Sequence, residues 1–148
     1  MKRLIIRSLL CLAVLLMLPA AAPAQGGKGV IEGSLGYPSD YIPQDMVVCA
    51  EDAATKKQYC TSRHLKGKKF KYGVGYRLEV PPGDYVVFAF LPHPEKHGAD
   101  YPKTYRAYYS EYVKCGMQVH CTSHRPVTVR VTAGKTLGRI DPLDWYNF

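Results

Sequence analysis

Four of the five histidines fall into two pairs with equal spacing, and imidazole pairs can bind metal ions. His93 and His97 are four residues apart, and so are His120 and His124. If the loops that carry them converge, four neutral imidazoles could hold zinc or copper. Pro94 interrupts the first pair, so a shared helix face cannot bring those two rings together. The alternative is that all four are solvated loop residues and that the protein has no cofactor.

Residues 63–71, with the sequence R-H-L-K-G-K-K-F-K, form a second candidate site because cations cluster on a short loop. Such a cluster suits an anionic polymer, an acidic glycan or lipid headgroups. The alternative is a solvated hairpin tip that binds nothing. The cations that would make the anion-binding site are Arg63, Lys66, Lys68, Lys69 and Lys71.

Tyrosines concentrate in residues 103–114, K-T-Y-R-A-Y-Y-S-E-Y-V-K. Their rings are amphipathic and could stack on sugar rings, but packing of a short helix against the sheet is the favoured interpretation. The chain shows no Ser-His-Asp order, paired-carboxylate site or phosphate-binding glycine loop. We therefore expect a protein that is not an enzyme.

The cysteines indicate two local disulfides, provided that the chain is exported to an oxidising compartment. Counting outward from a turn at residues 53–56 places Cys49 opposite Cys60. Facing residues on paired strands lie about 4.5 to 5.5 Å apart at Cα, which permits a bridge. Cys115 and Cys121 would then close a small loop. A zinc site with four cysteine ligands is the disfavoured alternative.

The N-terminus reads as a secretory signal, which supplies that compartment. Basic residues at positions 2–7 precede an apolar run at 9–18, and A-P-A at 22–24 is a cleavage site. We expect cleavage after Ala24, a single mature domain of residues 25–148, and a periplasmic or secreted protein. No transmembrane segment would remain after cleavage; an uncleaved anchor is the alternative. The mature net charge would be 17 − 12 = +5.

Short apolar and alternating stretches separated by turn residues predict an all-β protein, an antiparallel sandwich of about seven strands. The first strand should lie at an edge, and the strand at 84–91 should be central and buried on both faces. One short helix is expected at 103–114, capped by Gly116, with a strand of alternating tyrosines as the competing interpretation. Trp145 and Phe148 should pack down as a lid. The expected strands are 29–37, 45–50, 57–62, 74–80, 84–91, 126–132 and 136–140.

The stretch V-P-P-G-D-Y at residues 80–85 predicts a tight turn between two strands. Proline fixes the φ angle of the first turn position, and glycine supplies the positive φ that other residues avoid. We expect Gly83 to adopt that conformation.

Four segments carry a resemblance to a known family: G-V-I-E-G-S-L (29–35), V-V-C-A-E-D (47–52), Y-R-L-E-V-P-P-G-D-Y-V-V-F-A (76–89) and V-T-V-R-V-T-A-G (127–134). Together they resemble the carboxypeptidase regulatory-like domains of the transthyretin-like, or prealbumin-like, β-sandwich group. The resemblance covers residues 29–140, with 92–123 outside the usual pattern. It implies a module that is mostly non-catalytic and that braces enzymes, binds polymers or works at surfaces.

Two enzyme groups with related sandwiches do not match this chain. The transthyretin-related hydrolase ends in Tyr-Arg-Gly-Ser, whereas this chain ends D-W-Y-N-F. Intradiol dioxygenases bind iron through two Tyr and two His, and their R-x-H-x-H run is absent. We therefore expect a binding or structural module of the cell envelope, whose partner is an anionic polymer, a glycan or another envelope protein and not nucleic acid. A histidine-based, metal-binding periplasmic protein is the alternative.

Overall fold

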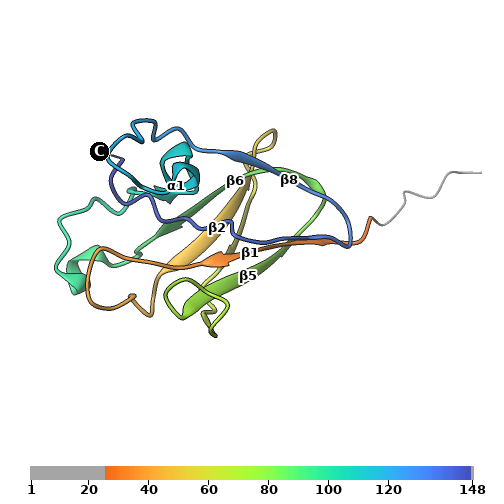
Figure 1. Cartoon of the computed structure of the whole chain (residues 1–148). Helices are drawn as coiled ribbons and strands as arrows, with labels where there is room; N and C mark the ends of the chain where they lie inside the picture. Colours follow the sequence, from red (N-terminus) through yellow and green to blue (C-terminus); the bar gives the residue numbers. More distant parts are fainter. Residues whose placement is uncertain (1–25, 148) are drawn as a thin grey trace, which may run out of the picture.

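The computed structural model describes residues 26–147, which form nine strands, one α-helix and one 3-10 helix. The expected signal segment and Phe148 lie outside the described residues. Two sheets face each other, with β1 (Gly29–Ser34) and β5 (Val74–Val80) in one layer and β2 (Val47–Asp52) and β6 (Gly83–Phe90) in the other (Figure 1). No helix within residues 26–147 is long and apolar enough to cross a membrane. The all-β sandwich is confirmed, with nine strands rather than about seven.

The first sheet has the order β4-β5-β1-β9, with β4 at Leu65–Lys66 and β9 at Thr136–Leu137. β1 pairs antiparallel with β5 on one side and parallel with β9 on the other. The expectation of an edge-like first strand is therefore wrong, and the sheet is not purely antiparallel. The physical reason is burial, because five of the six β1 residues are buried, as expected of an interior strand. The weak alternation of the sequence did not reveal this burial.

The second sheet has the order β3-β2-β6-β7, and β8 (Thr128–Val131) also pairs with β6. β3 spans Gln58–Thr61, and β7 is the short strand Ala107–Tyr108. β6 is thus the central strand, as its apolar run predicts. Side chains from both sheets, such as Ile31 and Leu78 from one and Val48 and Val87 from the other, share one hydrophobic core.

The Pro81–Pro82 link carries the chain from one sheet to the other, because β5 and β6 belong to different sheets. It is a corner of the sandwich and not a hairpin turn. Gly83 does not take the predicted positive φ; it begins β6 and pairs with Val131. Two prolines suit such a corner because they donate no hydrogen bond to either ladder. The Tyr85 hydroxyl donates to the Pro81 carbonyl at 2.9 Å and holds the corner against the core.

The helix predicted at 103–114 is wrong in extent, because α1 covers only Glu111–Cys115. Before it, Ala107 and Tyr108 form β7 and continue the sheet, so the competing strand interpretation holds for those two residues. Tyrosine favours strands, and the free edge of β6 offers backbone partners, among them the Val87 carbonyl for the Tyr109 amide. Ser110 caps the helix start, and Gly116 ends it in the left-handed conformation as predicted.

Both predicted disulfides are confirmed. Cys49 and Cys60 occupy facing positions on β2 and β3, and their Cα atoms are 4.1 Å apart. Cys115 and Cys121 close the loop after α1, with Cα atoms 5.9 Å apart. One bridge ties the edge strand β3 to its neighbour, and the other fixes the only α-helix of the described residues to the loop that follows it.

The C-terminal segment packs down on the core, as predicted for Trp145. That side chain is 2% exposed, and its indole nitrogen donates to the Gly36 carbonyl at 2.8 Å. The rings of Tyr37, Tyr101 and Tyr105 surround it. The C-terminus and α1 lie at the end of the sandwich opposite residue 26 (Figure 1).

Candidate binding cleft

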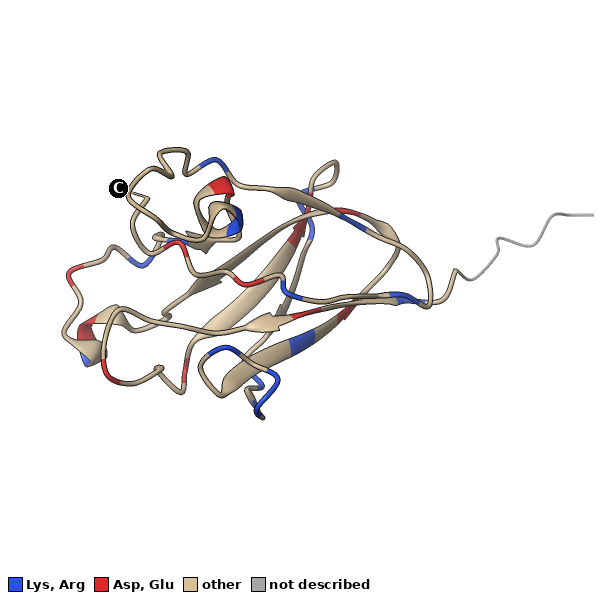
Figure 2. Ribbon diagram, viewed as in Figure 1, with Lys and Arg blue, Asp and Glu red and all other residues tan. Residues whose placement is uncertain are grey.

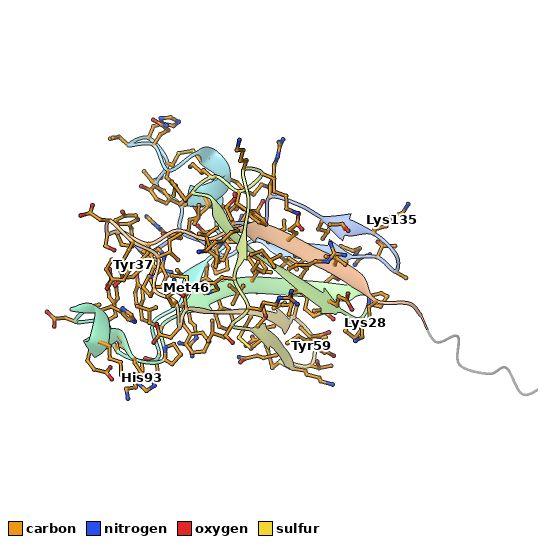
Figure 3. All side chains as sticks on the ribbon, turned by 90° about the horizontal axis from the view of Figure 1, so that it is seen from below. Lys28, Tyr37, Met46, Tyr59, His93 and Lys135 are labelled. Atoms are coloured by element: carbon orange, nitrogen blue, oxygen red, sulfur yellow. A yellow bond between two sulfur atoms is a disulfide. The ribbon has the colours of Figure 1, made fainter. Side chains whose placement is uncertain are left out.

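A cleft of about 390 Å³ opens at one end of the sandwich, where the loop after β1, the loop before β5 and the C-terminal segment meet. Tyr37, one of its lining residues, lies at the end opposite Lys28 and Lys135 (Figure 3). The lining residues are Gly36, Tyr37, Pro38, Ser39, Asp40, Tyr41, Ile42, Tyr72, Val74, Met117, Leu143, Trp145 and Tyr146.

Exposed aromatic rings gather in this cleft. Within residues 26–147, four large hydrophobic side chains stand out as exposed, and three of them line the cleft. They are Tyr41 at 53%, Tyr72 at 50% and Tyr146 at 49%; the fourth is Val119. A single exposed tyrosine needs no explanation, but three around one hollow form an apolar patch of the kind that marks binding sites.

Ring packing and hydrogen bonds orient the tyrosines of the cleft. Tyr37 packs edge-on against Trp145, with ring centroids 5.1 Å apart, and its burial raises the pKa of the Tyr37 phenol. The Ser39 hydroxyl donates to the Tyr41 carbonyl at 2.8 Å and fixes the loop that presents the Tyr41 ring. The Tyr41 hydroxyl in turn is 3.1 Å from Nδ1 of His97. Rings held in this way lose little conformational freedom when a ligand binds.

The basic stretch adjoins the cleft through Tyr72. All five candidate cations are exposed. Figure 2 shows Lys and Arg residues gathered on the loop that precedes β5. The Lys71 ammonium lies 5.3 Å from the centroid of the Tyr72 ring, which lines the cleft. Lys69 is 2.8 Å from the Glu32 carboxylate, so its charge is already paired. The buried Phe70 ring anchors the loop.

The four candidate histidines do not come together. His97 bonds the Asp45 carboxylate at 2.7 Å, and His93 lies 3.3 Å from the Glu95 carboxylate. His124 bonds the buried Asp144 carboxylate at 3.0 Å. The equal spacing of the two histidine pairs therefore did not predict that their loops would meet.

Within residues 26–147, one group of three potential metal ligands occurs, namely Cys115, His120 and Cys121. Its two sulfurs are joined in a disulfide and are therefore not available as thiolate ligands. Zinc or copper binding stays a prediction that the geometry of the histidines does not favour.

The tyrosines at 103–114 serve packing more than binding. Tyr105 and Tyr109 pack against the core, and Tyr105 stacks on Tyr101 with ring centroids 4.7 Å apart. Burial raises the pKa of Tyr105 to about 12. Sequence reasoning missed the cleft tyrosines at 37, 41, 72 and 146, because they come from separate loops and only the fold brings them together.

No family model and no curated protein matches this chain. Among solved structures, a leucine-rich repeat protein from Bacteroides thetaiotaomicron is similar, with a TM-score of 0.38 and 10% sequence identity. The similarity covers 79% of this chain and 14% of that protein's chain. At that TM-score it supports no argument about function.

Proposed function

We propose that this chain is an exported, non-catalytic binding module of the transthyretin-like type, and that its ligand is an acidic glycan of the cell envelope. The cleft would hold the sugar rings, and the adjoining lysines would pair with the acidic groups. Two disulfides fit an oxidising compartment, which is where such a glycan occurs.

The observation that carries the proposal is the meeting of Tyr41, Tyr72 and Tyr146 around one hollow, with Lys71 over the Tyr72 ring. Tyrosine offers a flat apolar face and a polar tip, which matches a sugar ring with its C–H face and hydroxyl rim. The hollow lies within the range of about 300 to 1,000 Å³ that is usual for ligand sites.

The charges beside the cleft favour an acidic ligand over a neutral one. Lys68 and Lys71 are exposed and have no ion-pair partner within the described residues, whereas Lys69 is paired with Glu32. Asp40 is the only acid that lines the cleft within residues 26–147. Lysines at such a rim attract carboxylates or sulfates and speed their association, an effect that salt screens.

The test is calorimetric titration with a galacturonate oligosaccharide and with its methyl-esterified, neutral counterpart. We expect tighter binding of the acidic form, and an affinity that falls as salt is added. Tyr41→Ala and Tyr72→Ala should each weaken binding about tenfold. The double variant Lys68→Ala/Lys71→Ala should remove the preference for the acidic form, while Lys135→Ala, at the opposite end, serves as the matched control.

Two results would count against the proposal. Equal affinity for the acidic and neutral oligosaccharides would exclude the role of the lysines. Unchanged affinity in folded Tyr41→Ala and Tyr72→Ala proteins, or no binding of either oligosaccharide, would exclude the cleft as the glycan site.

A further inference from the structure

Asp144 is a carboxylate with no solvent exposure, and three donors surround it. The Ser110 hydroxyl donates to it at 2.6 Å, Nδ1 of His124 lies 3.0 Å from both of its oxygens, and the Tyr146 amide donates at 3.3 Å. A buried carboxylate is costly unless it is hydrogen-bonded in this way. The fold therefore holds the Asp144 carboxylate inside the protein, in contact with the His124 imidazole.

This arrangement fixes the orientation of His124. Since a carboxylate can only accept, the proton between the two residues belongs to Nδ1 of the imidazole. The His124 ring also stacks on Tyr112, with centroids 4.6 Å apart. In the neutral ring Nε2 is then an acceptor, and it lies on the side away from the buried carboxylate. The His124 side chain is 34% exposed and lines a second cavity of about 700 Å³.

The same cavity is lined by Arg106, whose guanidinium is also held in place. Its Nη1 donates to the carbonyls of Lys103 and Tyr105, both at 2.9 Å, and its central carbon lies 4.3 Å from the Phe90 ring centroid. Nε and Nη2 have no hydrogen-bond partner within residues 26–147. The remaining lining residues are Asp100, Tyr101, Pro102, Thr104, Tyr105, Tyr108, Pro126 and Asn147.

We propose that this second cavity binds a small hydroxy acid, with its carboxylate on Arg106 and a hydroxyl group donating to Nε2 of His124. Arginine recognises carboxylates through two parallel hydrogen bonds, and a fixed guanidinium loses little freedom in making them. When Nδ1 of an imidazole donates to a carboxylate, the ring orientation is fixed. Its Nε2 can then accept a hydrogen bond from a ligand hydroxyl along one fixed direction. Asp144 is a positioning residue, since it acts through His124.

The test uses the full mature chain with ¹⁵N-labelled histidine, and glucuronate as the probe. At a pH of about 8, at which free histidine is neutral, nitrogen–proton correlation spectra should report the Nδ1–H tautomer for His124. Glucuronate should shift the Nε2 resonance and saturate at about millimolar concentration. Glucose lacks the carboxylate and acetate lacks the hydroxyl, so we expect both to shift it far less. His93 is the internal control.

Variants then separate this site from the cleft. Arg106→Gln should weaken glucuronate binding about tenfold, and Arg106→Lys should weaken it less because it keeps the charge. Tyr72→Ala should leave it unchanged. An Nε2–H tautomer in the wild-type protein, no saturable shift with glucuronate, or an equal shift with glucose would overturn the proposal. All three results come from the wild-type protein, so they hold even if a variant fails to fold.

Discussion

Cys49 and Cys60 face each other across β2 and β3, and their disulfide joins Cα atoms 4.1 Å apart. β3 pairs with no strand other than β2 within residues 26–147, so this bridge is the covalent support of a sheet edge. The second bridge, Cys115–Cys121, closes a shorter loop, with a sequence separation of 6 against 11.

The loop lengths predict how much each bridge stabilises the fold. By the loop-entropy relation, Cys49→Ser/Cys60→Ser should lower the free energy of unfolding by roughly 3 kcal/mol, and Cys115→Ser/Cys121→Ser by roughly 2 kcal/mol. Urea denaturation of the two double variants at neutral pH measures both. A larger loss for the shorter loop would show that native contacts, rather than loop entropy, set the stabilisation.

Gly33 is required by the close passage of the C-terminal segment over β1. A Cβ atom at this position would lie 2.0 Å from the Ile140 carbonyl oxygen, and a backbone atom cannot give way cheaply. We expect Gly33→Ala to destabilise the protein by about 1 to 3 kcal/mol or to prevent folding. Gly138→Ala is the matched control, because a Cβ atom there would meet no other atom within 4 Å. Equal unfolding free energies for the two variants would refute this account.

Removing the Asp144 carboxylate should be costly because its donors are left without an acceptor. Asp144→Ala leaves the buried Ser110 hydroxyl without its acceptor, and a buried unsatisfied group costs about 1 to 3 kcal/mol. The partly buried Tyr146 amide also loses its acceptor. Ser110→Ala removes one donor and weakens the α1 cap, so we expect a loss of about 1 kcal/mol. Denaturant unfolding of both variants gives the comparison. A milder effect for Asp144→Ala than for Ser110→Ala would contradict the network.

Buried tyrosines predict a loss of stability at alkaline pH. Burial raises the pKa of Tyr105 to about 12 and holds the pKa of Tyr76 well above its usual value of 10.0. Above about pH 10 the unfolded chain releases phenol protons that the folded protein keeps, so the free energy of unfolding falls as pH rises towards the folded values. Below that pH both states are protonated and this contribution is fully present.

Urea unfolding at a series of pH values from about 9 to about 11, with phenolate absorbance in parallel, measures the effect. Tyr105→Phe removes one of the raised groups and should make the decline shallower. The same slope in Tyr105→Phe would mean that Tyr105 does not contribute to it.

The sequence predicted the sheets well where side chains alternate against one buried face. Residues 74–80 are the bounds of β5 itself, and the turn at 53–56 placed Cys49 opposite Cys60. It failed where a stretch could satisfy two patterns, as at 103–114, because backbone pairing with β6 decides there between strand and helix. It also failed at Pro81–Pro82, since a tight turn does not reveal which sheet the next strand joins.

The candidate binding cleft could not be predicted from the sequence, for a different reason. Tyr41, Tyr72 and Tyr146 are each ordinary loop tyrosines, and no periodicity links loops that are far apart in the chain. Only the basic stretch, which ends beside Tyr72, gave a local signal. The histidine pairs shared a spacing, yet the loops that carry them are held by different acids, so that spacing did not bring them together.

The position of β1 inside the first sheet has a consequence for the order of folding. Its two flanks are completed by β5 and by the chain around β9, and the Ser34 amide bonds Asp141, which lies 107 positions away. A chain that is synthesised from its N-terminus leaves one side of β1 unpaired until residues 136–137 have been added. Distant pairings of this kind form slowly and leave a strand edge open to aggregation meanwhile. We therefore expect the first sheet to close late in folding, and a chain cut before residue 136 to retain that open edge.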